Sequence, residues 1–365
     1  MSELAPTQSA LAARARLAVG VLAFCCLLWG YSFPVMKFGV AALERHLRVG
    51  QSSGLSGNPE GCPTGLSGDP EGRPPLPLAY ELAANGTFLG WRFLIATGLY
   101  WLLSRTHQRR FSKAELQGGL AVGATFALGM LVQIGGLRYT LPSISAFLTA
   151  LAVVFAPVAQ AFIFRRRVGF STWLAIGVAL AGIVVLSLPN PGAVEGVGGS
   201  LGGGAPALQA PPLPLLGEIL TTLGAVLFTA QILCLDHYGK QGSAVRLTLI
   251  VLATTALLCT LLGVALGGPT IYNCTTLPAL LSDSRFLWPL LSLAIFSSVL
   301  VTHLQNGYQP FISPAQACVV YCLEPVFATL FSVLFRTERL TFTTCAGGAV
   351  ILAAVLLVAR PKSDT

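Results

Sequence analysis

Ten apolar stretches recur along the 365-residue chain, and each is about 17 to 25 residues long, enough to cross a bilayer as a helix. Only 10% of the residues are charged and 54% are hydrophobic, whereas roughly a quarter of a soluble domain is charged. These features predict an all-α polytopic membrane protein with ten transmembrane helices. The stretches cover residues 17–41, 88–104, 116–137, 143–164, 170–188, 213–235, 245–266, 286–305, 314–335 and 341–359.

The basic residues indicate how these helices are oriented. If the stretches alternate in direction and the N-terminus lies inside, roughly 13 Lys and Arg fall on the inner side and roughly 7 on the outer side. Both termini, residues 1–16 and 360–365, are therefore expected in the cytoplasm, and the membrane is expected to be the cell membrane. This topology accounts for the net charge of +8 without a nucleic-acid partner, so the expected surroundings are lipid.

Two segments interrupt the apolar pattern. Residues 44–87 contain the near-copies GLSGNPEG and GLSGDPEG, a composition that predicts a low-complexity outer loop. Residues 189–212 are rich in Gly and Pro and contain no Lys or Arg, which predicts a flexible linker. The linker divides the stretches into five (17–188) and five (213–359). Because five is odd, two equivalent halves must insert with opposite orientations, an arrangement found in many secondary transporters.

The two halves also resemble each other in sequence. Residues 139–158 align without gaps with residues 307–326, and five positions match. The alignment places Pro157 opposite Pro325, and an alanine opposite Glu324. The halves are therefore expected to share a scaffold with kinking prolines, whereas the glutamate distinguishes the second half.

Five motifs, taken in order, resemble a known family. They are LLWGYSFPVMKFGV, WRFLIATGLYWLL, GGLRYTLPSISAFLTAL, GVALAGIVVL and CLEPVFATLFSVLFRTERLT. Together they are similar to the two EamA-type repeats of the drug/metabolite transporter (DMT) superfamily. The resemblance implies ten helices in two inverted five-helix repeats around a central pathway, and transport of small metabolites, amino acids or drugs. The first repeat departs from the pattern, since it has RRRV where the second has RTERL.

Glu324 is the main candidate for the pathway, because a carboxylate in the middle of an apolar stretch is costly and marks a functional site. Pro325 follows it, removes one backbone N–H and kinks the helix. Two hypotheses remain open: contact with substrate or protons, and a structural hydrogen bond from the protonated carboxyl group. Tyr321, almost one turn earlier, Gln133 and Gln231 are candidate hydrogen-bonding groups in a cavity.

Further polar and aromatic residues lie near the ends of the stretches. Lys37 and Arg92 are near the outer ends of the first two, where each either reaches the interface or pairs with a carboxylate or an anionic substrate group. Trp29 is either a wall of the pathway or a packing residue. The inner end of the eighth stretch carries three polar residues that either cap the helix or form a cytoplasmic gate, namely His303, Gln305 and Asn306.

The sequence contains no Ser/His/Asp set, dinucleotide fingerprint or metal motif, and its nine cysteines lack metal-ligand spacing. We therefore expect no enzymatic activity, no cofactor and no metal site. The residues favour a secondary transporter that moves a small molecule by alternating access, with proton exchange at Glu324 as one option. The alternatives are a non-transporting receptor or scaffold on the same fold, and a membrane-embedded enzyme. The sequence does not determine the oligomeric state.

Overall fold

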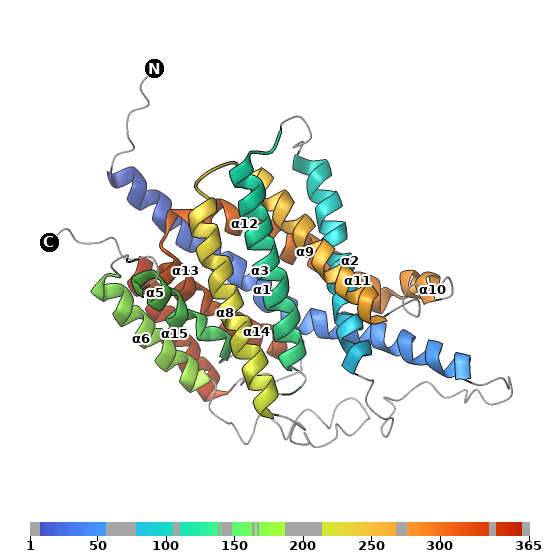
Figure 1. The fold of residues 1–365 in the computed structure, drawn as a ribbon. Coiled ribbons are helices and arrows are strands. Elements are labelled where there is room, and N and C mark those ends of the chain that lie inside the picture. Colours follow the sequence, from blue (N-terminus) through green and yellow to red (C-terminus); the bar gives the residue numbers. More distant parts are fainter. Residues whose placement is uncertain are drawn as a thin grey trace.

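The computed structural model is a bundle of helices (Figure 1). It describes residues 8–55, 78–104, 110–137, 139, 148–162, 165, 168–186, 214–267, 276–335 and 341–359. The helices of the first half are α1 (Gln8–Leu55), α2 (Leu78–Ser104), α3 (Lys113–Leu137), α5 (Ala152–Phe162) and α6 (Phe170–Leu186). Those of the second half are α8 (Pro214–Tyr238), α9 (Ala244–Gly267), α10 (Thr276–Ser282), α11 (Ser284–Ser292), the π-helix η3 (Leu293–Leu300), α12 (Val301–Tyr308), the 3-10 helix η4 (Gln309–Phe311), α13 (Pro314–Tyr321), α14 (Leu323–Leu334) and α15 (Phe342–Ala359).

Within the described ranges, six helical segments are long and apolar enough to cross a membrane. They are Ser9–His46, Lys113–Gly136, Leu215–Tyr238, Ala244–Gly267, Ser284–Phe311 and Pro314–Leu334. Shorter apolar helices cover Leu148–Phe162, Phe170–Val185 and Cys345–Ala359. With α2, these helices overlap every apolar stretch of the sequence, so the prediction of an all-α membrane protein is confirmed.

Helices α1 and α2 extend into residues that we expected in the outer loop. Helix α1 continues to Leu55 and α2 begins at Leu78, so residues 44–55 and 78–87 of the expected loop are helical. The apolar stretch of α1 is followed by ALERHL, which consists mostly of good helix formers, so the end of the apolar pattern does not end the helix. Residues 56–77, and the linker predicted at 189–212, lie outside the described residues.

Helices at corresponding places in the two halves pack against each other. Helix α2 lies along α9, and α6 lies along α15. Glycines permit both contacts: a Cβ atom on Gly86 of α2 would lie 2.9 Å from the backbone nitrogen of Gly263 on α9. A Cβ atom on Gly182 of α6 would lie 2.9 Å from the backbone nitrogen of Ile351 on α15. Close backbone approach at small residues is typical of helix packing in membranes.

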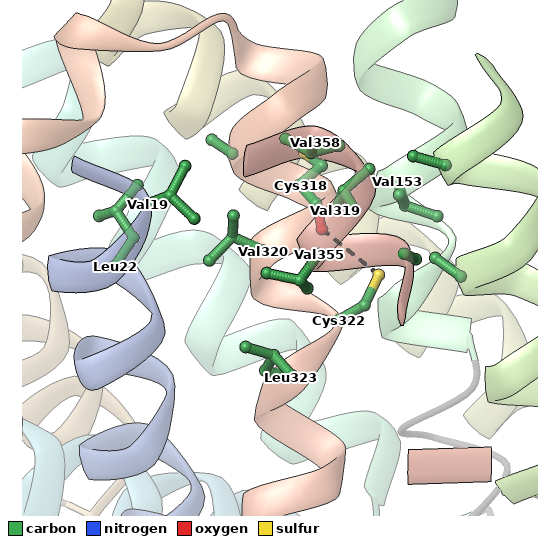
Figure 2. Close-up of a cluster of buried hydrophobic side chains, with 14 of the residues drawn as sticks. Val19, Leu22, Val153, Cys318, Val319, Val320, Cys322, Leu323, Val355 and Val358 are labelled. Atoms are coloured by element: carbon green, nitrogen blue, oxygen red, sulfur yellow. Dashed lines mark hydrogen bonds between the residues drawn. The ribbon is translucent and has the colours of Figure 1, made fainter. Parts of the chain in front are cut away.

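The largest buried cluster joins α1, α5, α6, α13 and α15, and Figure 2 shows its centre. Val19 and Leu22 of α1 face the chain around Val320, and Val355 of α15 packs from another side. In the same view Cys322 donates a hydrogen bond from Sγ to the carbonyl oxygen of Cys318, 3.3 Å away. This cluster holds α13 and α14 against the first half of the chain.

The ninth apolar stretch is interrupted where α13 meets α14. Helix α13 ends at Tyr321, Cys322 lies between the helices, and α14 begins at Leu323. Pro325 has no N–H, so it cannot donate the helical hydrogen bond to the carbonyl of Tyr321. The interruption places Glu324 in the first turn of α14.

Helix α1 crosses α14 just beyond this interruption. A Cβ atom on Gly30 would lie 2.5 Å from Cβ of Phe327 and 2.6 Å from the backbone nitrogen of Ala328. The rings of Tyr31 and Phe331 meet edge to face on the same side, with centroids 5.5 Å apart. The crossing brings the residues around Trp29 next to α13 and α14.

Candidate functional site

The helix formed by α11, η3, α12 and η4 carries a row of polar side chains through the apolar bundle. We call this row the polar track; it consists of Ser297, Ser298, His303, Gln305, Asn306 and Gln309, and all but His303 are buried. The track begins in the π-helix η3, whose wider turn is a feature often found at functional sites. Each of these side chains has a hydrogen-bond partner on another helix or on a neighbouring turn.

At one end of the track, four uncharged side chains form a hydrogen-bonded cluster, which we call the glutamine–tyrosine cluster: Gln231, Gln305, Gln309 and Tyr321. The hydroxyl of Tyr321 donates to Oε1 of Gln309 at 2.7 Å, and Nε2 of Gln305 donates to the Tyr321 hydroxyl at 3.1 Å. Nε2 of Gln231 on α8 lies 3.5 Å from Oε1 of Gln305, its acceptor. Because amides and hydroxyls both donate and accept, such a cluster can exchange its internal bonds for bonds to a polar guest.

Trp29 and Glu324 adjoin this cluster. The ring of Trp29 on α1 meets the ring of Tyr321 edge to face, with centroids 5.4 Å apart. Glu324, one turn after Tyr321, is half-buried, and Cys26 of α1 is close enough to interact with it electrostatically. Among the described residues, none donates a hydrogen bond to the Glu324 carboxylate. The carboxylate is therefore available for a proton or a polar guest.

The next residues of the track connect it to the first half and to α9. Nδ1 of His303 lies 2.9 Å from the Tyr100 hydroxyl of α2, and Nδ2 of Asn306 donates to Oγ1 of Thr248 at 3.0 Å. The sequence predicted His303, Gln305 and Asn306 as caps or a gate at a helix end. In the structure they join α12 to α2, α8, α9 and α13, so any movement of α12 must rearrange these bonds.

Arg92 occupies the other end of the track. Its Nε donates to Oγ of Ser298 at 2.7 Å and its Nη2 donates to Oγ of Ser297 at 2.9 Å. Only 2% of the side chain is exposed. The sequence predicted that Arg92 lies near a helix end; because α2 begins at Leu78, Arg92 instead lies near the middle of α2.

The chain matches a family in each of its halves. Residues 79–188 and 215–360 both match the model of the EamA-like transporter family. The chain belongs to the EamA-like transporter family. The resemblance to EamA-type repeats, predicted from the five motifs, is therefore confirmed.

A relative and a solved structure cover most of this EamA-like chain. The relative, named an uncharacterized transporter from Archaeoglobus fulgidus, is 26% identical over 338 residues, which make up 92% of this chain and 84% of the relative. A crystal structure of a protein with 15% identity has a TM-score of 0.57 and covers 94% of this chain and 98% of its own. At that identity the likeness shows the fold alone.

The structure brings only some of the predicted site residues of this EamA-like protein together. Trp29, Gln231, Gln305 and Tyr321 meet at the glutamine–tyrosine cluster, with Glu324 adjoining. Three others lie elsewhere or outside the description. Gln133 donates from Nε2 to Oγ1 of Thr149 at 2.8 Å within the first half, Pro157 lies inside α5, and the side chain of Lys37 is outside the described residues.

Sequence reasoning missed several partners. Gln309 is central to the cluster, and Ser297, Ser298 and Tyr100 hold Arg92 and His303. One signal was present for Gln309, because polar residues at 302, 305, 306 and 309 have the spacing of one helix face. The two adjacent serines gave no such signal, because neighbouring residues on an ordinary α-helix do not share a face.

Two polar contacts, the Glu115–Arg246 ion pair and the His46–Asp283 hydrogen bond, join the halves of this EamA-like bundle at its opposite ends. The carboxylate of Glu115 on α3 accepts from Nε and Nη2 of Arg246 on α9, at 2.8 and 2.6 Å, and from the backbone N–H of Ser243 at 2.8 Å. At the other end Nε2 of His46 on α1 lies 3.1 Å from Oδ2 of Asp283, which also caps α11. Asn306 donates a hydrogen bond to Thr248, which is two residues after Arg246 on α9. About 23 helical residues, or about 35 Å, separate Asn306 from Asp283, so the two contacts lie far apart along the bundle.

We expect a small pH-dependent contribution from Asp283. Its partial burial alone would raise its pKa, but the Arg285 N–H and the His46 ring together hold the pKa below the usual value. A lowered pKa means that the stabilisation is present above about pH 4 and is lost as the pH falls through the folded-state value. Asp283→Asn, which keeps a capping side chain, should therefore lower the melting temperature slightly from pH 6 to 8, since a partly exposed pair contributes about 0–1 kcal/mol. The difference from wild type should shrink near pH 3; an undiminished difference there would contradict this account.

Proposed function

We propose that this EamA-like chain is a secondary transporter that moves a small metabolite, an amino-acid-like compound or a drug across the cell membrane by alternating access. The observation that carries the proposal is the polar track, because its buried, hydrogen-bonded side chains run through an otherwise apolar bundle. Such residues are costly in lipid, and they often mark a substrate or ion pathway. A scaffold has no comparable use for them.

The packing of the helices supports a repeat arrangement of ten helices in two inverted halves. In the order of the apolar stretches, α2 and α9 are second and seventh, and α6 and α15 are fifth and tenth. Each pair is therefore a helix and its counterpart in the other repeat, as expected around a pseudo-two-fold axis. The two separate family matches favour the same division. With five helices per half the repeats are inverted, and the basic residues favour cytoplasmic termini.

The polar contacts at opposite ends suit alternating access. Each joins one half to the other, so the Glu115–Arg246 pair closes one end and the His46–Asp283 pair closes the other. With cytoplasmic termini, the Glu115 end faces the cytoplasm. Release of one pair while the other stays formed would open the polar track to one side at a time.

A transport screen tests the proposal. The purified protein is reconstituted in liposomes loaded with unlabelled compound, and counterflow of labelled amino acids, amines, monocarboxylates and nucleosides is measured. We expect exchange of at least one class above protein-free liposomes. Exchange of none would contradict transport and favour a receptor or scaffold.

We further propose that Glu324 carries the proton in proton-coupled transport. Glu324→Gln should then abolish accumulation driven by an imposed pH gradient but preserve counterflow, because the amide cannot release a proton while substrate exchange does not need one. Glu218→Gln, a carboxyl change near the start of α8, is the matched control and should behave as wild type. Gradient-driven accumulation that survives Glu324→Gln removes Glu324 from the coupling mechanism.

A further inference from the structure

Arg92 is a buried cation that has no acidic partner among the described residues. Its guanidinium stays charged at any physiological pH. The groups that it contacts through hydrogen bonds are the neutral hydroxyls of Ser297 and Ser298. In the part of the chain that the structure describes, no Asp or Glu forms an ion pair with it. A charge in the middle of a membrane helix without a counter-charge is unfavourable, and this arrangement is suited to an anion that enters from outside.

Hydrogen-bond donors with no acceptor gather at this point. Nη1 of Arg92 is buried and has no hydrogen-bond partner within the described part of the chain. Each serine hydroxyl accepts a bond from Arg92, and among the described residues neither donates its own O–H to another group. A hydroxyl can accept and donate at the same time. Up to three donors are therefore available for an acceptor with two oxygens.

The π-helix η3 explains how two adjacent serines serve one arginine. Neighbouring residues on an ordinary α-helix point in different directions, so only one of them would face α2. Here both hydroxyls reach the same guanidinium, at 2.7 and 2.9 Å, within the wider turn of η3. The same helix continues into α12 and the glutamine–tyrosine cluster, so the Arg92 end and the cluster are two ends of one polar track.

We propose that Arg92, Ser297 and Ser298 form the subsite for a carboxylate on the transported molecule. This inference rests on the proposed transport function. The planar guanidinium matches the two oxygens of a carboxylate, and one cation among neutral hydroxyls balances a single negative charge better than a phosphate dianion. With 2% exposure the subsite is closed in this structure, so it is loaded when α2 and η3 separate.

Wild-type protein provides the first test, because it needs no variant that must fold. The melting temperature of the purified protein is measured with benzoate, L-leucine and succinate, with benzamide and L-leucinamide, in which an amide replaces the carboxylate, and with inorganic phosphate. We expect stabilisation by at least one carboxylate and none by its amide. Equal stabilisation by acid and amide, stabilisation by phosphate alone, or no stabilisation by any carboxylate overturns the subsite.

Variants then locate the effect. Ser298→Ala should raise the carboxylate concentration needed for half-maximal stabilisation about tenfold or more, because a hydrogen bond to a charged group is lost. Arg92→Gln should abolish it, and Arg92→Lys should restore only part, since an ammonium lacks the planar fork. In the counterflow assay, undiminished carboxylate exchange by Arg92→Gln overturns the subsite but leaves transport standing. Absence of exchange by wild type is instead the failure of the proposed function.

Discussion

Replacing Gly30 by alanine is expected to destabilise the protein by about 1–3 kcal/mol, the usual cost of overpacking a tight contact. The added methyl group would lie 2.6 Å from the backbone nitrogen of Ala328 and 2.7 Å from the carbonyl carbon of Phe327. Backbone atoms cannot rotate away as a side chain can, so α1 and α14 must move apart. The separation would disturb the contact of Trp29 with Tyr321 and the position of Glu324, so transport should fall together with stability.

Gly20→Ala is the matched control, because Gly20 lies on the same helix and nothing is within 4 Å of its would-be Cβ atom. Both variants gain the higher helix propensity of alanine. The difference between their melting temperatures therefore reports the effect of the added methyl group on the contact between α1 and α14. Thermal unfolding in detergent should show a lower melting temperature for Gly30→Ala and no loss for Gly20→Ala. Equal melting temperatures would mean that the crossing of α1 and α14 is not tight.

The sequence predicted the helices well because a membrane imposes a simple requirement on them. Each apolar stretch overlaps a helix, since backbone groups in lipid must bond within their own segment. The ends were less predictable: α1 runs on to Leu55 through residues that favour a helix although they are polar. The π-helix η3 could not be predicted, because its residues LAIFSSVL read as an ordinary apolar helix.

The site was predictable in residue type but not in pairing. Tyr321, Gln231 and Gln305 stood out because polar side chains are rare in apolar stretches. Their hydrogen bonds, however, join residues far apart in the chain, such as Gln231 and Gln305, and only the packing of the helices sets these contacts. The position of Arg92 was also not predictable from the sequence. Its place near the middle of α2 follows from the start of α2 at Leu78, and its bonds to two adjacent serines depend on the wider turn of η3.

Replacing Glu115 by glutamine should open one end of the bundle. Only 2% of the Glu115 side chain is exposed. Its two oxygens accept hydrogen bonds from Nε and Nη2 of Arg246 and from the backbone N–H groups of Ser112 and Ser243. Glutamine has one oxygen and no charge, so the two-point bond to Arg246 is lost while one backbone bond can remain. Because this carboxylate joins α3 of the first half to α9 of the second, its loss should favour the state in which the halves separate there.

Hydrogen–deuterium exchange can test this without any substrate. In Glu115→Gln, amides at the beginning of α3 and α9 should exchange about tenfold faster, on the scale of typical coupling free energies between sites. If the ends open alternately, exchange around Asp283 should stay the same or slow, because the His46 pair remains formed. Lys240→Gln is the control, since it removes an ion pair with Asp236 at the same end within one half. Faster exchange in both variants would indicate a general loss of structure at that end, whereas unchanged exchange in Glu115→Gln would show that this pair does not hold the two halves together.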